Sequence, residues 1–276
     1  MTAPVQVAVT GPFDDPRSPA LRFLQEAARL GEVTVVLWPD DMTRELDGAP
    51  PKFPLAERAY FLQALRYVKN VLPATGAAAA DCLPRAPGFH PGLWALEEAR
   101  AGPAQREFCR KESLPYRVLG GEALRGFPPA ASPQPPGGAA RKKVIATGSF
   151  DWLHSGHVRF LEEAAGHGDL YVVVGHDANI RLLKGASHPL FPQEERRYMV
   201  QSIRFVTEAL ISTGHGWLDA APEIERIEPD IYAVNQDGDQ GGKREYCRQQ
   251  GIEYLVLQRL PAHGLPRRSS TELRGF

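Results

Sequence analysis

The sequence has 276 residues, 43% of them hydrophobic, which is enough for one large domain or for two domains of about 130 residues. Its 32 basic and 33 acidic residues nearly cancel, which argues against a protein that binds nucleic acid through charge. No run of about 18 apolar residues could cross a membrane, and the first residues enter a strand pattern without a signal-peptide head, so we expect a cytoplasmic protein. The cysteines, Cys82, Cys109 and Cys247, show no C-x-x-C spacing, which argues against a disulfide framework and a zinc site.

An internal repeat organises the chain. The segment that begins VAVTGPFDDPRSPALRF at Val7 returns as VIATGSFDWLHSGHVRF at Val144, and after a one-residue insertion the match resumes at Phe53 and Phe191. Each copy is predicted to run strand, helix, strand, loop, long amphipathic helix, and two further strands with a helix between them. Self-similarity over a whole domain length indicates two copies of one fold.

A stretch rich in proline, glycine and alanine, PPAASPQPPGGAA, separates the copies. It predicts a linker over residues 128–141, between domains at 1–127 and 142–276. Alternating helices and nearly continuous apolar strands indicate a parallel sheet flanked by helices, so we expect an α/β protein with two tandem Rossmann-like domains. The later strands expected in the second copy are Leu170–Val174, Ala209–Ser212, Ile231–Val234 and Tyr254–Leu257.

The most informative motif follows the first strand of the second copy. The apolar run that starts at Val144 leads through TGSFD into His154, Ser155, Gly156 and His157, after which apolar residues recur at helical spacing. A glycine-containing turn from a strand into a helix favours phosphate binding, because the backbone N–H groups and the positive end of the helix dipole attract anions. Two imidazoles three positions apart could donate to the same phosphate.

The first copy lacks these groups. Arg17 and Ala20 stand in place of His154 and His157, and a segment equivalent to residues 266–272 is missing. We therefore expect a non-catalytic first domain that completes an intramolecular pseudo-dimer, as if the subunits of a twofold dimer were fused. The alternative is that this domain binds a different ligand through Arg17 or Asp40. Beside the pseudo-dimer, a homodimer of the whole chain stays open.

The second copy resembles the cytidylyltransferase branch of the nucleotidylyltransferases, an H-x-G-H superfamily. The resemblance is carried by TGSFDWLHSGH at residues 147–157, by the predicted helix QEERRYMVQSIRFV at 193–206, and by RRSST at 267–271. It is strongest to ethanolamine-phosphate and glycerol-3-phosphate cytidylyltransferases, of which the former also has one degenerate copy of two. That degenerate copy is the C-terminal one in the family and the N-terminal one here.

The resemblance implies a chemistry and a set of residues. A phosphate oxygen of the acceptor attacks the α-phosphorus of a nucleoside triphosphate and releases pyrophosphate, so positioning and charge neutralisation suffice. His154 and His157 would bind the triphosphate and stabilise the transition state, and Lys184, in the loop after the second strand, would reach phosphate oxygens. The other nucleotide-binding positions expected are Thr147, Gly148, Ser149, Phe150, Gly156, Asp237, Arg267, Arg268, Ser269, Ser270 and Thr271.

Several of these positions have a structural alternative. Arg196 and Asp177 could contact phosphate, but the first copy keeps the arginine as Arg58, so an ion pair is equally expected. Asp151 is also kept, as Asp14, which favours a turn role. The serines of the RRSST segment could be plain helix caps.

The sequence contains no dedicated carboxylate cage, so the expected Mg²⁺ would be carried by the triphosphate, and the H-x-G-H motif lacks the third ligand of a zinc site.

The nucleotide and the acceptor stay open at the level of sequence. The RRSST segment is shorter than its usual cytidylyltransferase counterpart, and the expected G-[ND]-D turn reads NQDGD. ATP-using relatives, such as those that make ADP-heptose or FAD, also end in short serine-rich segments. We expect CTP, with ATP as the alternative, and an acceptor that is a small phospho-alcohol or phosphonate, near Trp152, Trp217 or His215. A regulatory module that binds a nucleotide without turnover is the competing hypothesis.

Overall fold

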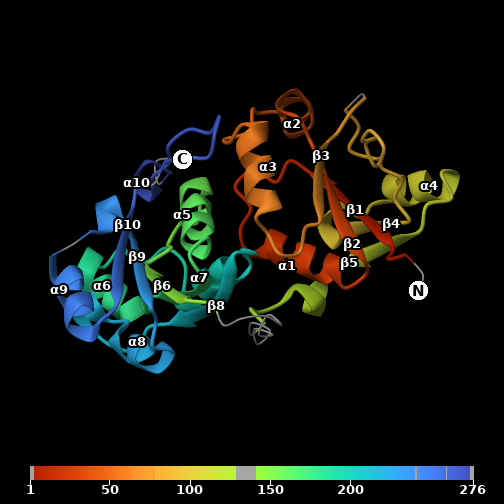
Figure 1. The fold of residues 1–276 in the computed structure, drawn as a ribbon. Coiled ribbons are helices and arrows are strands. Elements are labelled where there is room, and N and C mark those ends of the chain that lie inside the picture. Colours follow the sequence, from red (N-terminus) through yellow and green to blue (C-terminus); the bar gives the residue numbers. More distant parts are fainter. Residues whose placement is uncertain (1–2, 77, 129–140, 240, 259, 274–276) are drawn as a thin grey trace. The chain divides into compact units, whose positions relative to one another are not determined.

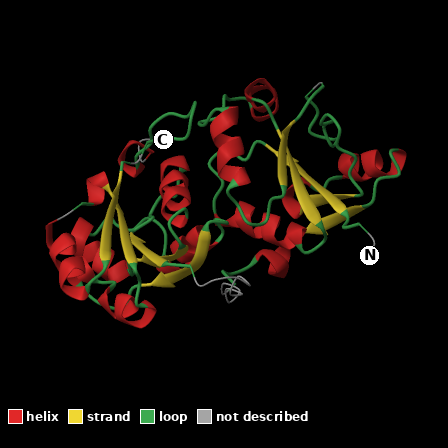
Figure 2. Cartoon of the chain, in the orientation of Figure 1, coloured by secondary structure: helices red, strands yellow, loops and turns green. Residues whose placement is uncertain are grey.

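The computed structural model describes residues 3–76, 78–128, 141–239, 241–258 and 260–273. The chain divides into two compact units, Met1–Gly126 and Phe127–Phe276. Figure 2 shows a separate sheet in each, with helices on both of its faces. Most of the predicted linker, residues 129–140, lies outside the described residues. In the described part of the chain, no helix has the length and apolar character needed to cross a membrane.

The first unit has a five-stranded parallel sheet in the order β3-β2-β1-β4-β5. Its elements are β1 Gln6–Gly11, α1 Ser18–Ala28, β2 Glu32–Leu37, α2 Asp40–Asp47, α3 Leu55–Gln63, β3 Asn70–Pro73, β4 Leu93–Glu97, η1 Glu98–Arg100, α4 Pro103–Lys111, β5 Tyr116–Leu119 and η2 Gly121–Leu124.

The second unit repeats this topology with the order β10-β9-β6-β7-β8. Its elements are β6 Lys143–Gly148, α5 Ser155–Ala165, β7 Asp169–Val174, α6 Asp177–Lys184, α7 Gln193–Gln201, β8 Val206–Ile211, η3 Gly216–Leu218, α8 Ala221–Ile227, β9 Ile231–Asn235, η4 Gln236–Gly238, α9 Gly241–Gln250, β10 Glu253–Leu257 and α10 Ser270–Leu273. The predicted α/β fold is therefore confirmed.

The central strands are apolar along their whole length because both faces of the sheet are covered. Val144 and Ile145 of β6 are fully buried. On one face, Ile145 packs in a cluster with Ile224 of α8 and Cys247 of α9. Helix α5 covers the opposite face (Figure 1). Burial raises the pKa of the Cys247 thiol to about 11, so this cysteine is an inert core residue at neutral pH.

Two local predictions were wrong. The segment predicted as one helix over residues 193–206 ends as helix α7 at Gln201, whose side chain accepts a hydrogen bond from the Ala209 N–H of β8 at 2.6 Å. The next residue, Ser202, bonds back to the Tyr198 carbonyl at 2.9 Å, and the chain then turns into β8. Lys184 was expected in a loop but is the last residue of α6, which stops at Gly185 with a φ of 93°.

The topology fixes where a ligand can bind. All strands of the second sheet are parallel, so their carboxyl ends meet at one edge, and the strand order reverses between β6 and β9. In open α/β sheets the crevice at such a reversal receives the ligand. Strand β6 delivers the histidine turn to this edge, and β9 delivers the segment that begins at Asn235.

Candidate active site

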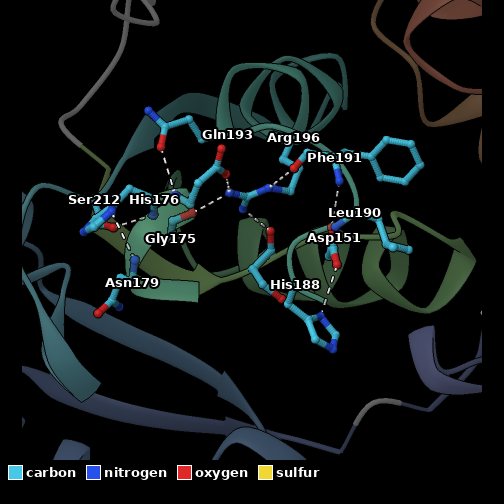
Figure 3. Close-up of polar contacts among 12 residues, drawn as sticks. Asp151, Gly175, His176, Asn179, His188, Leu190, Phe191, Gln193, Arg196 and Ser212 are labelled. Atoms are coloured by element: carbon cyan, nitrogen blue, oxygen red, sulfur yellow. Dashed lines mark hydrogen bonds and ion pairs between the residues drawn. The ribbon is translucent and has the colours of Figure 1, made fainter. Parts of the chain in front are cut away.

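The turn after β6 is held in one tight conformation. Phe150 has a φ of 48°, and its ring lies against Gly148, where a Cβ atom would approach the ring to 3.0 Å. The Asp151 carboxylate then accepts the N–H groups of Leu190 and Phe191 at 2.7 and 3.1 Å (Figure 3). Asp14 accepts the equivalent two N–H groups in the first unit, which supports the turn role expected for this aspartate.

The two histidines meet at the start of α5. His154 is the N-cap residue, 3% exposed, and its Nδ1 accepts the Gly156 N–H at 3.1 Å. An accepting Nδ1 places the proton of the neutral imidazole on Nε2, which makes Nε2 a donor. The His157 ring lies 4.0 Å from the His154 ring, centroid to centroid, at the positive end of the helix dipole. Both rings are therefore placed to donate to one anion.

The segment near the C-terminus lies over the same helix start. A Cβ atom at Gly156 would come within 3.3 Å of the Arg268 carbonyl oxygen, so the glycine permits the close approach. The Ser270 hydroxyl also reaches the Trp152 carbonyl at 3.4 Å. The structure thus brings the predicted RRSST segment to the H-x-G-H turn, although the two stretches are far apart in sequence.

Within this segment, the predicted residues differ in their present contacts. The Ser269 hydroxyl accepts the Glu272 N–H at 3.3 Å, and the Glu272 carboxylate accepts the Ser269 N–H at 3.2 Å, which is a capping box. Ser269 therefore fits the plain helix-cap alternative. Arg267 is exposed and Arg268 half-buried, and the side chain of Thr271 lies outside the described residues.

Lys184 reaches the site from α6. Its ammonium donates to the Ser149 hydroxyl at 2.9 Å, so two predicted phosphate-binding residues lie in direct contact. The lysine is exposed, and its long stem leaves the charge able to move toward an anion. Helix α6 and the turn after β6 together place this cation beside the histidine turn.

Arg196 is engaged with the protein itself (Figure 3). Its guanidinium donates to the carbonyls of Phe191, Ser149 and Gly175 at 2.9, 2.6 and 2.8 Å. It also pairs with Asp177 at 2.7 Å. Arg58 and Asp40 make the same pair in the first unit, at 2.6 Å. The geometry therefore supports the structural alternative for Arg196 and Asp177.

Two further predicted residues lie along β6 and β9. The Thr147 hydroxyl of β6 shares a 2.7 Å hydrogen bond with the Tyr232 hydroxyl of the neighbouring strand β9. Burial raises the pKa of Tyr232 far above its ordinary value, so this phenol stays protonated. Asp237 is exposed on η4, directly after β9.

Sequence reasoning missed two polar residues at this edge. Asn235 ends β9, and its Oδ1 is buried with no hydrogen-bond partner among the described residues. The Lys243 ammonium donates to the Gly238 carbonyl at 3.3 Å, and burial lowers the pKa of this lysine. The sequence signal for both was the NQDGD segment, which Asn235 begins and which Lys243 follows by four residues. The pairing of β9 with β6 places that segment at the crevice.

The aromatic residues predicted near the acceptor occupy different places. Trp152 packs edge-on against Phe191, with 5.9 Å between ring centroids, next to the histidine turn. Trp217 is 55% exposed and lies against Gly242 at the start of α9. The His215 ring packs edge-on against the His176 ring, with 5.2 Å between the ring centroids. Of the three, Trp152 belongs to the histidine turn itself.

Among the described side chains, no three His, Cys, Asp or Glu residues converge as a metal-binding group. Mg²⁺ carried by the triphosphate stays a prediction.

Comparison with known proteins places the second unit in a family. The cytidylyltransferase-like family model matches residues 145–274. The FAD synthase of Ferroglobus placidus is 41% identical over 120 residues, which cover 42% of this chain and 75% of that protein. The FAD synthase of Methanocella arvoryzae is 34% identical over 136 residues, which cover 48% of this chain and 93% of that protein. A solved structure, the lipopolysaccharide core biosynthesis protein from Thermoplasma volcanium, is 26% identical with a TM-score of 0.36, covering 42% of this chain and 93% of that one. Through its second unit, the chain belongs to the cytidylyltransferase-like family and is a nucleotidyltransferase.

Proposed function

We propose that the second unit transfers an adenylyl group from ATP to the phosphate of FMN, giving FAD and pyrophosphate. The observation that carries the proposal is the 41% identity to a protein named FAD synthase, over 120 residues. The cytidylyltransferase-like family model matches residues 145–274, which include His154 and His157, whose ring centroids lie 4.0 Å apart at a helix start. Making FAD with a nucleotidyltransferase requires joining AMP to the FMN phosphate, which defines both substrates.

This proposal changes two expectations drawn from the sequence. CTP was expected as the nucleotide, whereas the names of the relatives favour the ATP alternative. A small phospho-alcohol or phosphonate was expected as the acceptor, whereas FAD synthesis calls for a flavin phosphate. The short RRSST segment, shared in kind with ATP-using relatives, is consistent with the revised donor.

The reaction needs no covalent intermediate. An oxygen of the FMN phosphate attacks the α-phosphorus of ATP, the bond between the α-phosphorus and the bridging oxygen breaks, and pyrophosphate leaves with that electron pair. The Nε2–H of His154 and the imidazole of His157 donate to the phosphate oxygens as charge develops, and Lys184 neutralises part of that charge. Mg²⁺ bound to the triphosphate would supply further charge neutralisation.

Pyrophosphate release and product chromatography with the full chain test the proposal. ATP or CTP is offered with FMN, ethanolamine phosphate or glycerol 3-phosphate, in the presence of Mg²⁺. We expect FAD from ATP and FMN, and little product from CTP. A cytidylyl product with a phospho-alcohol would contradict the proposal and support CTP, the donor first expected from the sequence. Tight nucleotide binding without turnover on any acceptor would instead favour a regulatory module.

A pair of variants locates the chemistry. His157→Ala removes a donor to the reacting phosphate, and we expect kcat to fall by about 10²- to 10³-fold. His167→Ala is the matched control, because this exposed histidine follows the opposite end of the same helix. Equal activity of the two variants would contradict the assignment of the site to the H-x-G-H turn.

A further inference from the structure

The first unit has lost the histidines but keeps a cavity at the equivalent edge of its sheet. The cavity has a volume of about 740 Å³ and lies at the carboxyl ends of β1 and β4. These strands form the strand-order reversal of the first sheet, as β6 and β9 do in the second. A space of this size holds a small organic ligand.

Residues that line this cavity carry more negative charge than the residues at the equivalent positions of the second unit. Asp47 ends α2 where Lys184 ends α6, and Glu97 ends β4 where Asn235 ends β9. Both changes add negative charge at the edge of the sheet. Ala20 replaces His157.

The start of α1 is also less suited to binding an anion than the start of α5. Pro19 takes the place of Gly156 and has no backbone N–H, so the start of α1 has one donor fewer than the start of α5. Each difference weakens the attraction for phosphate.

The residues that line the cavity carry a net negative charge. Four acidic residues, Asp14, Asp15, Asp47 and Glu97, line the cavity, against two arginines. Arg17 pairs with Asp15 at 2.5 Å. Arg100 lies over the Trp38 ring at 5.5 Å. The net negative charge disfavours a triphosphate, which would have to enter against like charges.

One wall of the cavity is apolar and preformed. Trp38, Trp94 and Phe23 line it from the packed core, where they are at most 5% exposed, so this wall keeps its shape without a ligand. Glu97 is the last residue of β4, the strand next to the central strand β1. A carboxylate in that position can accept hydrogen bonds from sugar hydroxyls, as acidic residues do in Rossmann-like sites.

We propose that the first unit binds a neutral ring system that carries a hydroxylated chain and no phosphate. Nucleosides and riboflavin share this chemistry. The proposal goes beyond the nucleotidyltransferase reaction and is independent of it, because it concerns a cavity formed wholly by residues 10–105.

Tryptophan fluorescence of the full chain provides a test. The protein has four tryptophans, of which Trp38 and Trp94 line the cavity. In the Trp152→Phe/Trp217→Phe double variant the emission therefore reports on the first unit. We expect adenosine to quench this emission at a concentration at least about tenfold lower than ATP, at low ionic strength. The same measurement is made with riboflavin and FMN. Comparing riboflavin with adenosine then shows whether the cavity prefers a flavin or a nucleoside.

Two further variants, both made in that background, make the test decisive. Asp47→Asn/Glu97→Gln keeps the shape of the cavity and removes two charges, and we expect it to reduce the preference for adenosine over ATP at least about threefold. Ala20→Phe fills the cavity where His157 would lie, and we expect it to abolish quenching while circular dichroism stays unchanged. Stronger quenching by ATP than by adenosine would overturn the proposal. So would the absence of quenching both by adenosine up to about 1 mM and by a saturated riboflavin solution.

Discussion

His154 performs two tasks with its two ring nitrogens. Nδ1 accepts the Gly156 N–H and caps α5, which leaves the proton of the neutral imidazole on Nε2 as a donor. A cap and a phosphate donor are separable functions, because an asparagine can also cap a helix but cannot extend a donor to the position of Nε2. Arg17 caps α1 in the first unit without any side-chain cap hydrogen bond, so the fold tolerates loss of the cap.

Substitution of His154 should separate these tasks. In His154→Asn we expect the free energy of unfolding to stay within about 0.5 kcal/mol of the parent, since the cap is kept, while kcat falls by about 10²-fold or more. In His154→Ala we expect the same loss of kcat and, in addition, a loss of about 1 kcal/mol of stability. Urea unfolding and turnover assays measure the two effects. An active His154→Asn enzyme would show that the Nε2 donor is dispensable.

At the scale of elements, a buried arginine fixes the loops that carry the site. Arg196 on α7 contacts the exit of β6 through Ser149, the end of β7 through Gly175, and the start of α6 through Asp177. The side chain is 1% exposed, so its charge is stabilised by these three acceptors and by the Phe191 carbonyl rather than by water. The turn with the histidines and the helix with Lys184 are thereby held in one arrangement.

The variant Arg196→Lys should test whether these contacts hold the turn and α6 in place. A single ammonium keeps the charge but cannot serve four acceptors, so we expect the second unit to lose about 2–4 kcal/mol of stability. Hydrogen exchange of the β7 amides measures the loss within that unit. Arg58→Lys is the matched control, for which we expect faster exchange in β2 and a kcat within about twofold of the parent. Unchanged β7 exchange in Arg196→Lys would contradict the structural role.

The elements also show how far sequence reasoning reaches. The histidine turn and the strands were predictable, because local apolar patterns and the internal repeat both indicated them. The end of α7 was not, because it depends on a side-chain contact from Gln201 to β8. Asn235 and Lys243 were missed for a related reason, since their closeness to the crevice follows from the pairing of β9 with β6.

At the scale of the whole molecule, one fold occurs twice with opposite chemistry at its carboxyl edge. The second unit gathers histidines and a lysine, and the first gathers carboxylates around an apolar cavity. Both units keep the arginine–aspartate pair that fixes the loops. The pair shared by both copies thus belongs to the fold itself, whereas the residues that differ are those that we propose for ligand binding.

The pseudo-dimer expected from the repeat is tested by separating the units. If the first unit supports the second, residues 141–276 alone should aggregate or lose more than about half of the activity, as one half of a fused dimer would. Adding residues 1–128 in trans should then restore turnover. Size-exclusion chromatography and pyrophosphate release measure the two effects. A soluble, monomeric and fully active piece would instead mean that the first unit serves only its own ligand.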